Sequence, residues 1–339
     1  MAQQEANKLR TILDDGYLPA SKQTSKANRG KTFNEIAGLC KQDWLRRQQE
    51  GDLSSTTVAG YNTFLKPLEK QWGKKLIAAI TFDEVLDYRA ALAERKSQIL
   101  SNRRLFILKQ LFAKAKILGA IREDEIAGIK YLSEKGHERK SFMYPAKVDK
   151  LLEKAASSRA KHYLPLAILL AVEHGASKQE ILDLKWADIT LDYGETGVVR
   201  FYRTKTGVER VHQLMPRTRE ALLKRKAHLA KGRETRNIKS CGDYVVGHMD
   251  GSRMGDFKTA WKRVCGDLDL HDFHFHDNRH TFCSNIIMAG GTLKHAKEMI
   301  GHKTLRMTDR YSHLEAAREN IIQSALASHY AGPSEAADT

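Results

Sequence analysis

The segment HFHDNRHTF runs from His274 to Phe282 and follows His271 closely, so that four histidines fall within ten residues. Such a cluster can be a metal site, a set of packed or solvated imidazoles, or part of a phosphate-binding site. Zinc sites do use histidines four residues apart on one helix face, as His276 and His280 are. No HExxH motif is present, however, and no Cys or Glu stands at an obvious ligand spacing. We therefore predict no metal and no cofactor.

Arg279 changes the interpretation of this segment. Positions three apart share a helix face, so His276 and Arg279 can point at one ligand. Arginine offers a planar fork of donors suited to phosphate, and histidine exchanges protons near neutral pH. Downstream lie His302, in IGHKT, and Tyr311, in TDRYSHL. A tyrosine acts as a nucleophile only beside groups that take its proton or stabilise its oxyanion, because free tyrosine titrates near pH 10.

The composition points to a polyanionic partner. The 339 residues contain 57 Lys and Arg against 41 Asp and Glu, a formal net charge of +16, and the basic residues are spread along the chain. A folded protein that presents basic faces to nucleic acid fits this pattern, although a merely basic protein would share it. The four cysteines form no CxxC pair, and no apolar run of about 20 residues or signal-peptide pattern occurs. We expect a cytoplasmic protein with reduced thiols.

The chain divides into segments of different character. Capping boxes at Thr32–Glu35 and Thr81–Glu84 open amphipathic helices, and helical patterns continue to about residue 132. The polar stretch SEKGHERKSFMYP lacks periodicity and ends on a proline, which is typical of a linker. The expected segments are an N-terminal arm or the remnant of an upstream arm-binding domain (1–30), a helical bundle (31–132), a linker (133–145), a second domain (146–328) and a flexible tail (329–339).

The second domain carries the strongest β pattern. GVVRFYR (197–203) and ERVHQL (209–214) flank TKTGV and predict a two-stranded antiparallel hairpin. We expect helices at 146–157, 163–173, 178–184 and through TREALLKRKAHLA, a further short strand at 244–246, and helices from there to about residue 328. The predicted fold class is mainly α with a small antiparallel β-hairpin or sheet, in two domains.

The C-terminal half resembles the tyrosine recombinase, or phage integrase, family. The motifs that carry the resemblance are HDNR at 276–279 followed by His280, Gly301-His302, and Tyr311 nine residues later. Upstream, HGASKQEILDLKWADI resembles the family's first box and YRTKTGVERVHQL its β-hairpin. The 31–132 bundle resembles the core-binding domain in size and position only. The resemblance covers roughly residues 30 to 325 and is specific in the second domain.

The resemblance implies a role for each matching residue. Tyr311 would attack a DNA phosphate, giving a 3′-phosphotyrosyl link and a free 5′-hydroxyl. Arg279 would bind the non-bridging oxygens, and His276 would assist proton transfer from Tyr311. Lys205 on the hairpin would protonate the leaving 5′-oxygen, and His302 would donate to the phosphate. By this resemblance the reaction would need neither a metal nor a high-energy cofactor.

Ser177 departs from the family pattern. The first box carries another arginine at this position, and loss of such a clamp costs two or more powers of ten in rate. An engineered inactive variant, a natural divergent enzyme, and replacement by Lys178 are the three explanations. The last is disfavoured because one residue turns a side chain by about 100°.

Several further residues have two interpretations each. We expect Arg203, Arg210, Arg103, Arg104 and Lys109 to contact DNA, although for Arg203 and Arg210 a solvated strand face explains the pattern equally well. Glu180 is expected to hold basic residues in place. Trp186 is more consistent with core packing than with DNA contact, and His280 and His313 remain open between function and packing.

The resemblance implies a site-specific recombinase that integrates or excises a mobile element or prophage. Four protomers would act on double-stranded DNA, with DNA-bending or directionality factors as accessory partners near the nucleoid, and Ser177 would impair the activity. The alternatives are a type IB topoisomerase, which shares the tyrosine chemistry, and a non-catalytic DNA-binding or architectural protein on the same fold, which Ser177 favours.

Overall fold

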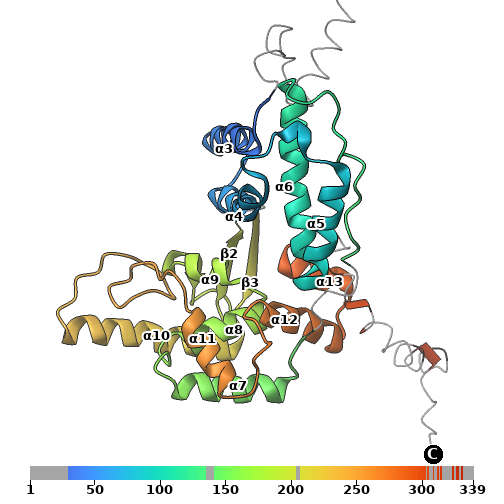
Figure 1. Ribbon diagram of the computed structural model, residues 1–339. Coiled ribbons are helices and arrows are strands. Elements are labelled where there is room, and N and C mark those ends of the chain that lie inside the picture. Colours follow the sequence, from blue (N-terminus) through green and yellow to red (C-terminus); the bar gives the residue numbers. More distant parts are fainter. Residues whose placement is uncertain are drawn as a thin grey trace, which may run out of the picture. The chain divides into compact units, whose positions relative to one another are not determined.

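The computed structural model describes residues 30–134, 141–203 and 207–302, and beyond these residues 304, 308, 311, 312, 314, 323, 326, 327 and 330. The side chains of Arg203 and Val208 lie outside this description. The chain divides into two compact units, Met1–His137 and Glu138–Thr339 (Figure 1). Most of the predicted arm (1–30) and of the C-terminal tail (329–339) lies outside the described residues.

The first unit is a bundle of α-helices. Its helices are α3 (Phe33–Gln49), α4 (Ser55–Trp72), α5 (Phe82–Arg95) and α6 (Gln98–Ile117), with a 3₁₀ turn at Ile77–Ala79. Both predicted capping boxes are present: the side chains of Thr32 and Thr81 each accept from the backbone N–H of the glutamate three residues on. These bonds satisfy N–H groups that have no partner inside the helix. The apolar faces of the helices meet in one core that includes Trp44, Leu65 and Leu108.

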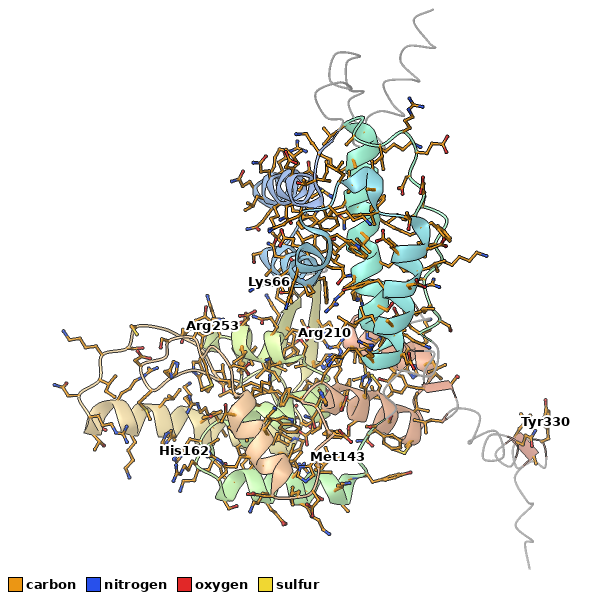
Figure 2. The ribbon with its side chains drawn as sticks, in the orientation of Figure 1. Lys66, Met143, His162, Arg210, Arg253 and Tyr330 are labelled. Atoms are coloured by element: carbon orange, nitrogen blue, oxygen red, sulfur yellow. The ribbon has the colours of Figure 1, made fainter. Side chains whose placement is uncertain are left out.

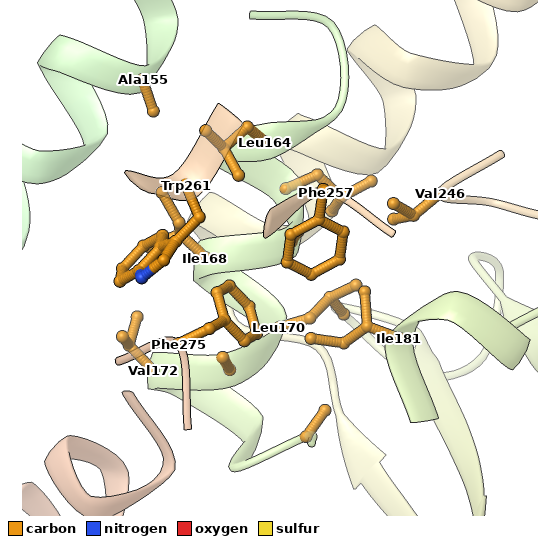
Figure 3. Packing of buried hydrophobic residues seen from close by; sticks show 14 of the residues in the cluster. Ala155, Leu164, Ile168, Leu170, Val172, Ile181, Val246, Phe257, Trp261 and Phe275 are labelled. Atoms are coloured by element: carbon orange, nitrogen blue, oxygen red, sulfur yellow. The ribbon is translucent and has the colours of Figure 1, made fainter. Parts of the chain in front are cut away.

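The second unit surrounds a nearly all-apolar helix. Its elements are α7 (Pro145–Ser157), α8 (Leu164–His174), α9 (Lys178–Asp183), a 3₁₀ turn (Trp186–Asp188), β1 (Ile189–Thr190), β2 (Val198–Arg203), β3 (Val208–Gln213), α10 (Pro216–Thr235), α11 (Lys258–Gly266), α12 (Asp277–Met288) and α13 (Leu293–Ile300). α8 is hydrophobic on every side because other elements cover it all round. Ile168 and Leu170 of α8 pack with Phe257, Trp261 and Phe275 (Figure 3).

The sheet is small and antiparallel, in the order β1-β2-β3. In the predicted hairpin Arg203 pairs with Val208 and Val198 with Gln213. The sequence did not indicate β1, which contributes two residues. The strand predicted at 244–246 is wrong: Tyr244 forms an isolated bridge with Lys185, and Val245 and Val246 are buried in the core. The mainly α fold class with a small antiparallel sheet is confirmed. Among the described helices none is long and apolar enough to cross a membrane.

Candidate active site

The opening segment forms the start of α12. Phe273 and Phe275 are buried in the core, so the residues between and after them are held at the helix entrance. The carboxylate of Asp277 accepts from the backbone N–H of His274 at 2.7 Å, which fixes the first turn. His276 is the N-cap residue and its ring is exposed, whereas Arg279 and His280 are buried. The segment is therefore the start of a helix in which Arg279 points inward. Among the described residues, no group of three His, Cys, Asp or Glu side chains is placed to bind a metal ion.

Two helix C-termini meet at Arg279. Its guanidinium donates to the carbonyl of Gly175, just past α8, and to the carbonyl of Ile300, the last residue of α13. Both helices end on a left-handed glycine, Gly175 at φ 64° and Gly301 at φ 67°. Residues with a side chain rarely adopt this conformation, and it turns the last carbonyls of a helix away from the helical path. The negative ends of both helix dipoles thus face one cation, a favourable arrangement.

Glu180 joins Arg279 to a second arginine. One carboxylate oxygen lies 2.6 Å from Nη2 of Arg210, and the other lies 3.4 Å from Nη1 of Arg279; the side chains of all three residues are only 3% exposed. Burial raises the pKa of Glu180 and is the largest effect, but Arg210, the Ser177 N–H and Arg279 together bring that pKa below its ordinary value. Glu180 is therefore a buried anion at neutral pH, consistent with its expected function of holding basic residues.

Ser177 takes part in a local cap. It is the N-cap residue of α9: its hydroxyl accepts from the Glu180 N–H at 3.4 Å, and its own N–H donates to the Glu180 carboxylate at 2.7 Å. This is the Ser-x-x-Glu capping box, a pattern visible in the sequence and missed there. Lys178, the alternative cation, forms an ion pair with Asp256 at 3.0 Å.

Tyr311 lies against α12. Its side chain is buried with Phe282, Cys283 and Ile287, and its hydroxyl is hydrogen-bonded to Nδ1 of His280. The sequence did not distinguish a functional from a packing role for His280. In the structure its ring contacts the Tyr311 hydroxyl and also packs against the ring of His276, with ring centroids 5.2 Å apart.

His302 and a pair of buried histidines complete the surroundings. Nδ1 of His302 lies 3.2 Å from the hydroxyl of Thr308. Burial lowers the pKa of His174 to about 3, with His212 and Arg210 adding to the effect. Burial, followed by Arg210, lowers the pKa of His212 to about 4. Both imidazoles are therefore neutral at physiological pH, beside the arginines.

The burial of Arg210 decides against one of the two interpretations that its sequence position allowed. It is buried on β3, so the solvated strand face is wrong for this residue. In Figure 2 it lies among side chains gathered near β3, whereas Arg253 lies farther out. The reason is its ion pair with Glu180, thirty residues away, which strand periodicity does not reveal.

The remaining predicted residues divide between described and undescribed parts. Lys205 and His313 lie outside the described residues, as does the side chain of Arg203. In the first unit Arg103 is exposed. Arg104 donates to the Tyr88 hydroxyl, and Lys109 donates to the carbonyl of Ala127 at 2.6 Å. Trp186 is half-buried against the core of the second unit, as expected.

Comparison with known proteins identifies the family. A model of the phage integrase family matches residues 141–318, just over half of the chain. The chain belongs to this family.

Relatives of the family extend the match beyond the second unit. The chain is 26% identical over 275 residues to a tyrosine recombinase XerC of Roseiflexus castenholzii, covering 78% of this chain and 85% of the relative. A lambda integrase dimer bound to a COC′ core site has a TM-score of 0.68 at 18% identity, covering 91% of this chain and 85% of that one. A lambda integrase tetramer bound to a Holliday junction has a TM-score of 0.65 at 19% identity, covering 91% and 86%. At these identities the two structures establish the shared fold.

Proposed function

We propose that this chain is a site-specific DNA recombinase that cuts and rejoins DNA through a tyrosine-linked intermediate. The observation that carries the proposal is on α12: Arg279 and His280 are neighbours, and the hydroxyl of Tyr311 is bonded to His280. In this proposal Arg279 is the phosphate-binding cation, and His280, the next residue of α12, is a proton acceptor for the phenol. Membership of the family and the likeness to XerC, named a tyrosine recombinase, support the same reaction.

The chemistry follows from these groups. The Tyr311 oxygen forms a bond to phosphorus while the bond from phosphorus to the 5′-oxygen breaks. The phenol proton passes to an imidazole; His280 is in contact, and His276 is the residue that the resemblance implies. Arg279 stabilises the charge that grows on the non-bridging oxygens. The 5′-oxygen takes up a proton, from Lys205 by resemblance. The 5′-hydroxyl of a second strand then attacks the phosphotyrosyl phosphorus and releases Tyr311, so that each step exchanges one phosphate ester bond for another.

The test is a covalent adduct. Duplexes tiled across the DNA that flanks the gene for this chain, each nicked near its centre, are incubated with the protein and resolved under denaturing conditions. We expect an SDS-stable adduct that Tyr311→Phe abolishes while DNA affinity is kept. EDTA should leave the adduct unchanged, and an EDTA-sensitive adduct would contradict the metal-free reaction. Absence of any adduct from the wild type and from Ser177→Arg would refute the proposal.

Ser177 supports a second candidate, a DNA-binding protein on the same fold that does not cleave. Its hydroxyl caps α9 and offers one neutral hydrogen bond where the family's first box carries a cation. An adduct from Ser177→Arg but none from the wild type would identify a disabled recombinase. Binding by both without any adduct would favour the non-catalytic protein.

We also propose the setting of this reaction. Double-stranded DNA is the substrate, and four protomers assemble on two sites, as the tetramer on a Holliday junction suggests for lambda integrase. The 31–132 bundle also contacts the DNA, and integration or excision of a mobile element is the outcome. Size measurement of the protein with and without a specific duplex tests the assembly.

A further inference from the structure

Arg210 contacts the two backbone carbonyls that immediately precede, in the sequence, the two bound by Arg279. Arg279 donates to the carbonyls of Gly175 and Ile300; Arg210 donates to the carbonyl of Met299 at 2.8 Å and lies 3.5 Å from that of His174. Each guanidinium therefore reaches the end of α8 and the end of α13. The carboxylate of Glu180 connects the two guanidiniums, one oxygen to each.

This arrangement gives the site a second guanidinium. Ser177 is engaged in the cap of α9, and Lys178 pairs with Asp256, so neither side chain supplies a cation to Glu180. Arg210 supplies it from β3. The ring of Phe201, 5.3 Å from its guanidinium carbon, covers one face of the cation, and such packing further restricts its orientation.

We infer that Arg210 is a positioning residue of the recombination site, which acts through Glu180 and the end of α13 to hold Arg279 and to compensate for the uncharged Ser177. The inference rests on the proposed function. Since Glu180 is divided between two guanidiniums, removal of one lets the carboxylate neutralise the other more fully. Arg279 would then offer less positive charge to a phosphate. The carbonyl of Met299, which also accepts from His212, would lose its Arg210 donor two residues before Gly301, and His302 follows directly.

The experiment combines substitutions at Arg210 and Ser177 in the full chain. The adduct rate at saturating protein is measured on a nicked duplex that the wild type cleaves, together with affinity for the same duplex. For Arg210→Met we expect a rate about 100-fold lower, the range for loss of a preorganised charged contact, and an affinity within about threefold. Arg210→Lys keeps the charge but not the fork, so its rate should fall between. Ser177→Arg in the Arg210→Met protein should restore at least tenfold, because a guanidinium returns to the site.

Two further measurements test whether the role of Arg210 is purely structural. Arg225 is equally buried in the same unit and donates to the carbonyls of Val245 and Gly247. Arg225→Met is thus the matched control: it should lower thermal stability but not the rate per folded molecule. A methylphosphonate at the cleaved position removes the charge of one phosphate oxygen, so the rate penalty of Arg210→Met should shrink to within about threefold. A merely unfolded site would keep the full penalty.

The outcomes separate the two proposals. An active wild type whose rate is unaffected by Arg210→Met, or a double variant without restored rate, overturns the role of Arg210 and leaves the recombinase assignment standing. An inactive wild type beside an active Ser177→Arg also overturns it, because Arg210 would then fail to compensate. No adduct from any variant refutes the proposed function itself.

Discussion

Replacing Glu180 by glutamine should show how much its carboxylate stabilises the buried guanidiniums of Arg210 and Arg279. The glutamine side chain would keep an oxygen for the α9 cap but leave two buried guanidiniums without their shared anion. Breaking a buried ion pair costs about 3–5 kcal/mol, and each 1.36 kcal/mol is a factor of ten. The second unit should therefore open roughly 10² to 10⁴ times more often.

Hydrogen–deuterium exchange of the full chain near pH 7 measures this directly. Peptides from α8, β3 and α13 should lose protection in Glu180→Gln, while peptides from α3 to α6 serve as the internal reference. Glu220→Gln is the matched control, because Glu220 pairs with Lys224 at 2.6 Å on the exposed face of α10 and should change nothing. Protection in the second unit that stays within about threefold of wild type would refute the idea that Glu180 is the counter-charge.

The same substitution should change the acid response. The pKa of Glu180 is lower in the folded protein, so its stabilisation is complete above the ordinary glutamate value of about 4.3 and is lost as the pH falls through the folded value. Urea denaturation across that window should show this loss in the wild type and not in Glu180→Gln. Equal acid sensitivity of the two proteins would contradict the assignment.

Three other changes test neighbouring features, each by urea denaturation followed by circular dichroism. Gly175→Ala would place a Cβ about 2.5 Å from Phe282 and 2.8 Å from Ile300 at φ +64°, so the second unit should lose about 2–5 kcal/mol; a loss below about 1 kcal/mol would show that the helix end can relax. Unfolded histidine binds a proton below about pH 6.5, whereas His212 binds one in the folded state only near pH 4. The free energy of unfolding therefore decreases as the pH is lowered from about 6.5 to about 4. His212→Gln should make this decrease shallower by up to about 1.4 kcal/mol per pH unit. An unchanged pH dependence would contradict a buried neutral imidazole at His212. Leu170→Ala, at the centre of the core, should cost about 2–5 kcal/mol, and a smaller loss would mean that α8 repacks.

Local rules predicted the parts of the fold that local interactions determine. Thr32 with Glu35 and Thr81 with Glu84 lie three residues apart and begin helices as expected. The two β-rich runs likewise pair as an antiparallel hairpin, as expected. The strand expected at 244–246 failed because apolar β-branched residues also suit a buried loop, and β1 is too short to leave a pattern.

The site depends on pairings that periodicity cannot show. Arg279 meets Gly175 across 104 positions, and Tyr311 meets His280 across 31. The sequence predicted which side chains would carry the chemistry, and this stays a prediction. It did not show that Arg210 would be buried, since a charged residue in a strand is ordinarily assigned to the solvent face. One signal was available and overlooked: Ser177 and Glu180 have the spacing of a capping box.

The fixed end of α13 limits how far Tyr311, the proposed nucleophile, can move. Arg210 and Arg279 hold the carbonyls of Met299 and Ile300, so displacement of Tyr311 relative to the arginines must be absorbed after Gly301. Tyr311 lies ten positions after Gly301, and a fully extended chain spans at most about 3.3–3.6 Å per residue. The intervening chain therefore confines the phenol oxygen to within roughly 40 Å of Gly301, side chain included. Any phosphate that Tyr311 attacks, on its own protomer's DNA or on a neighbour's, must come within that sphere.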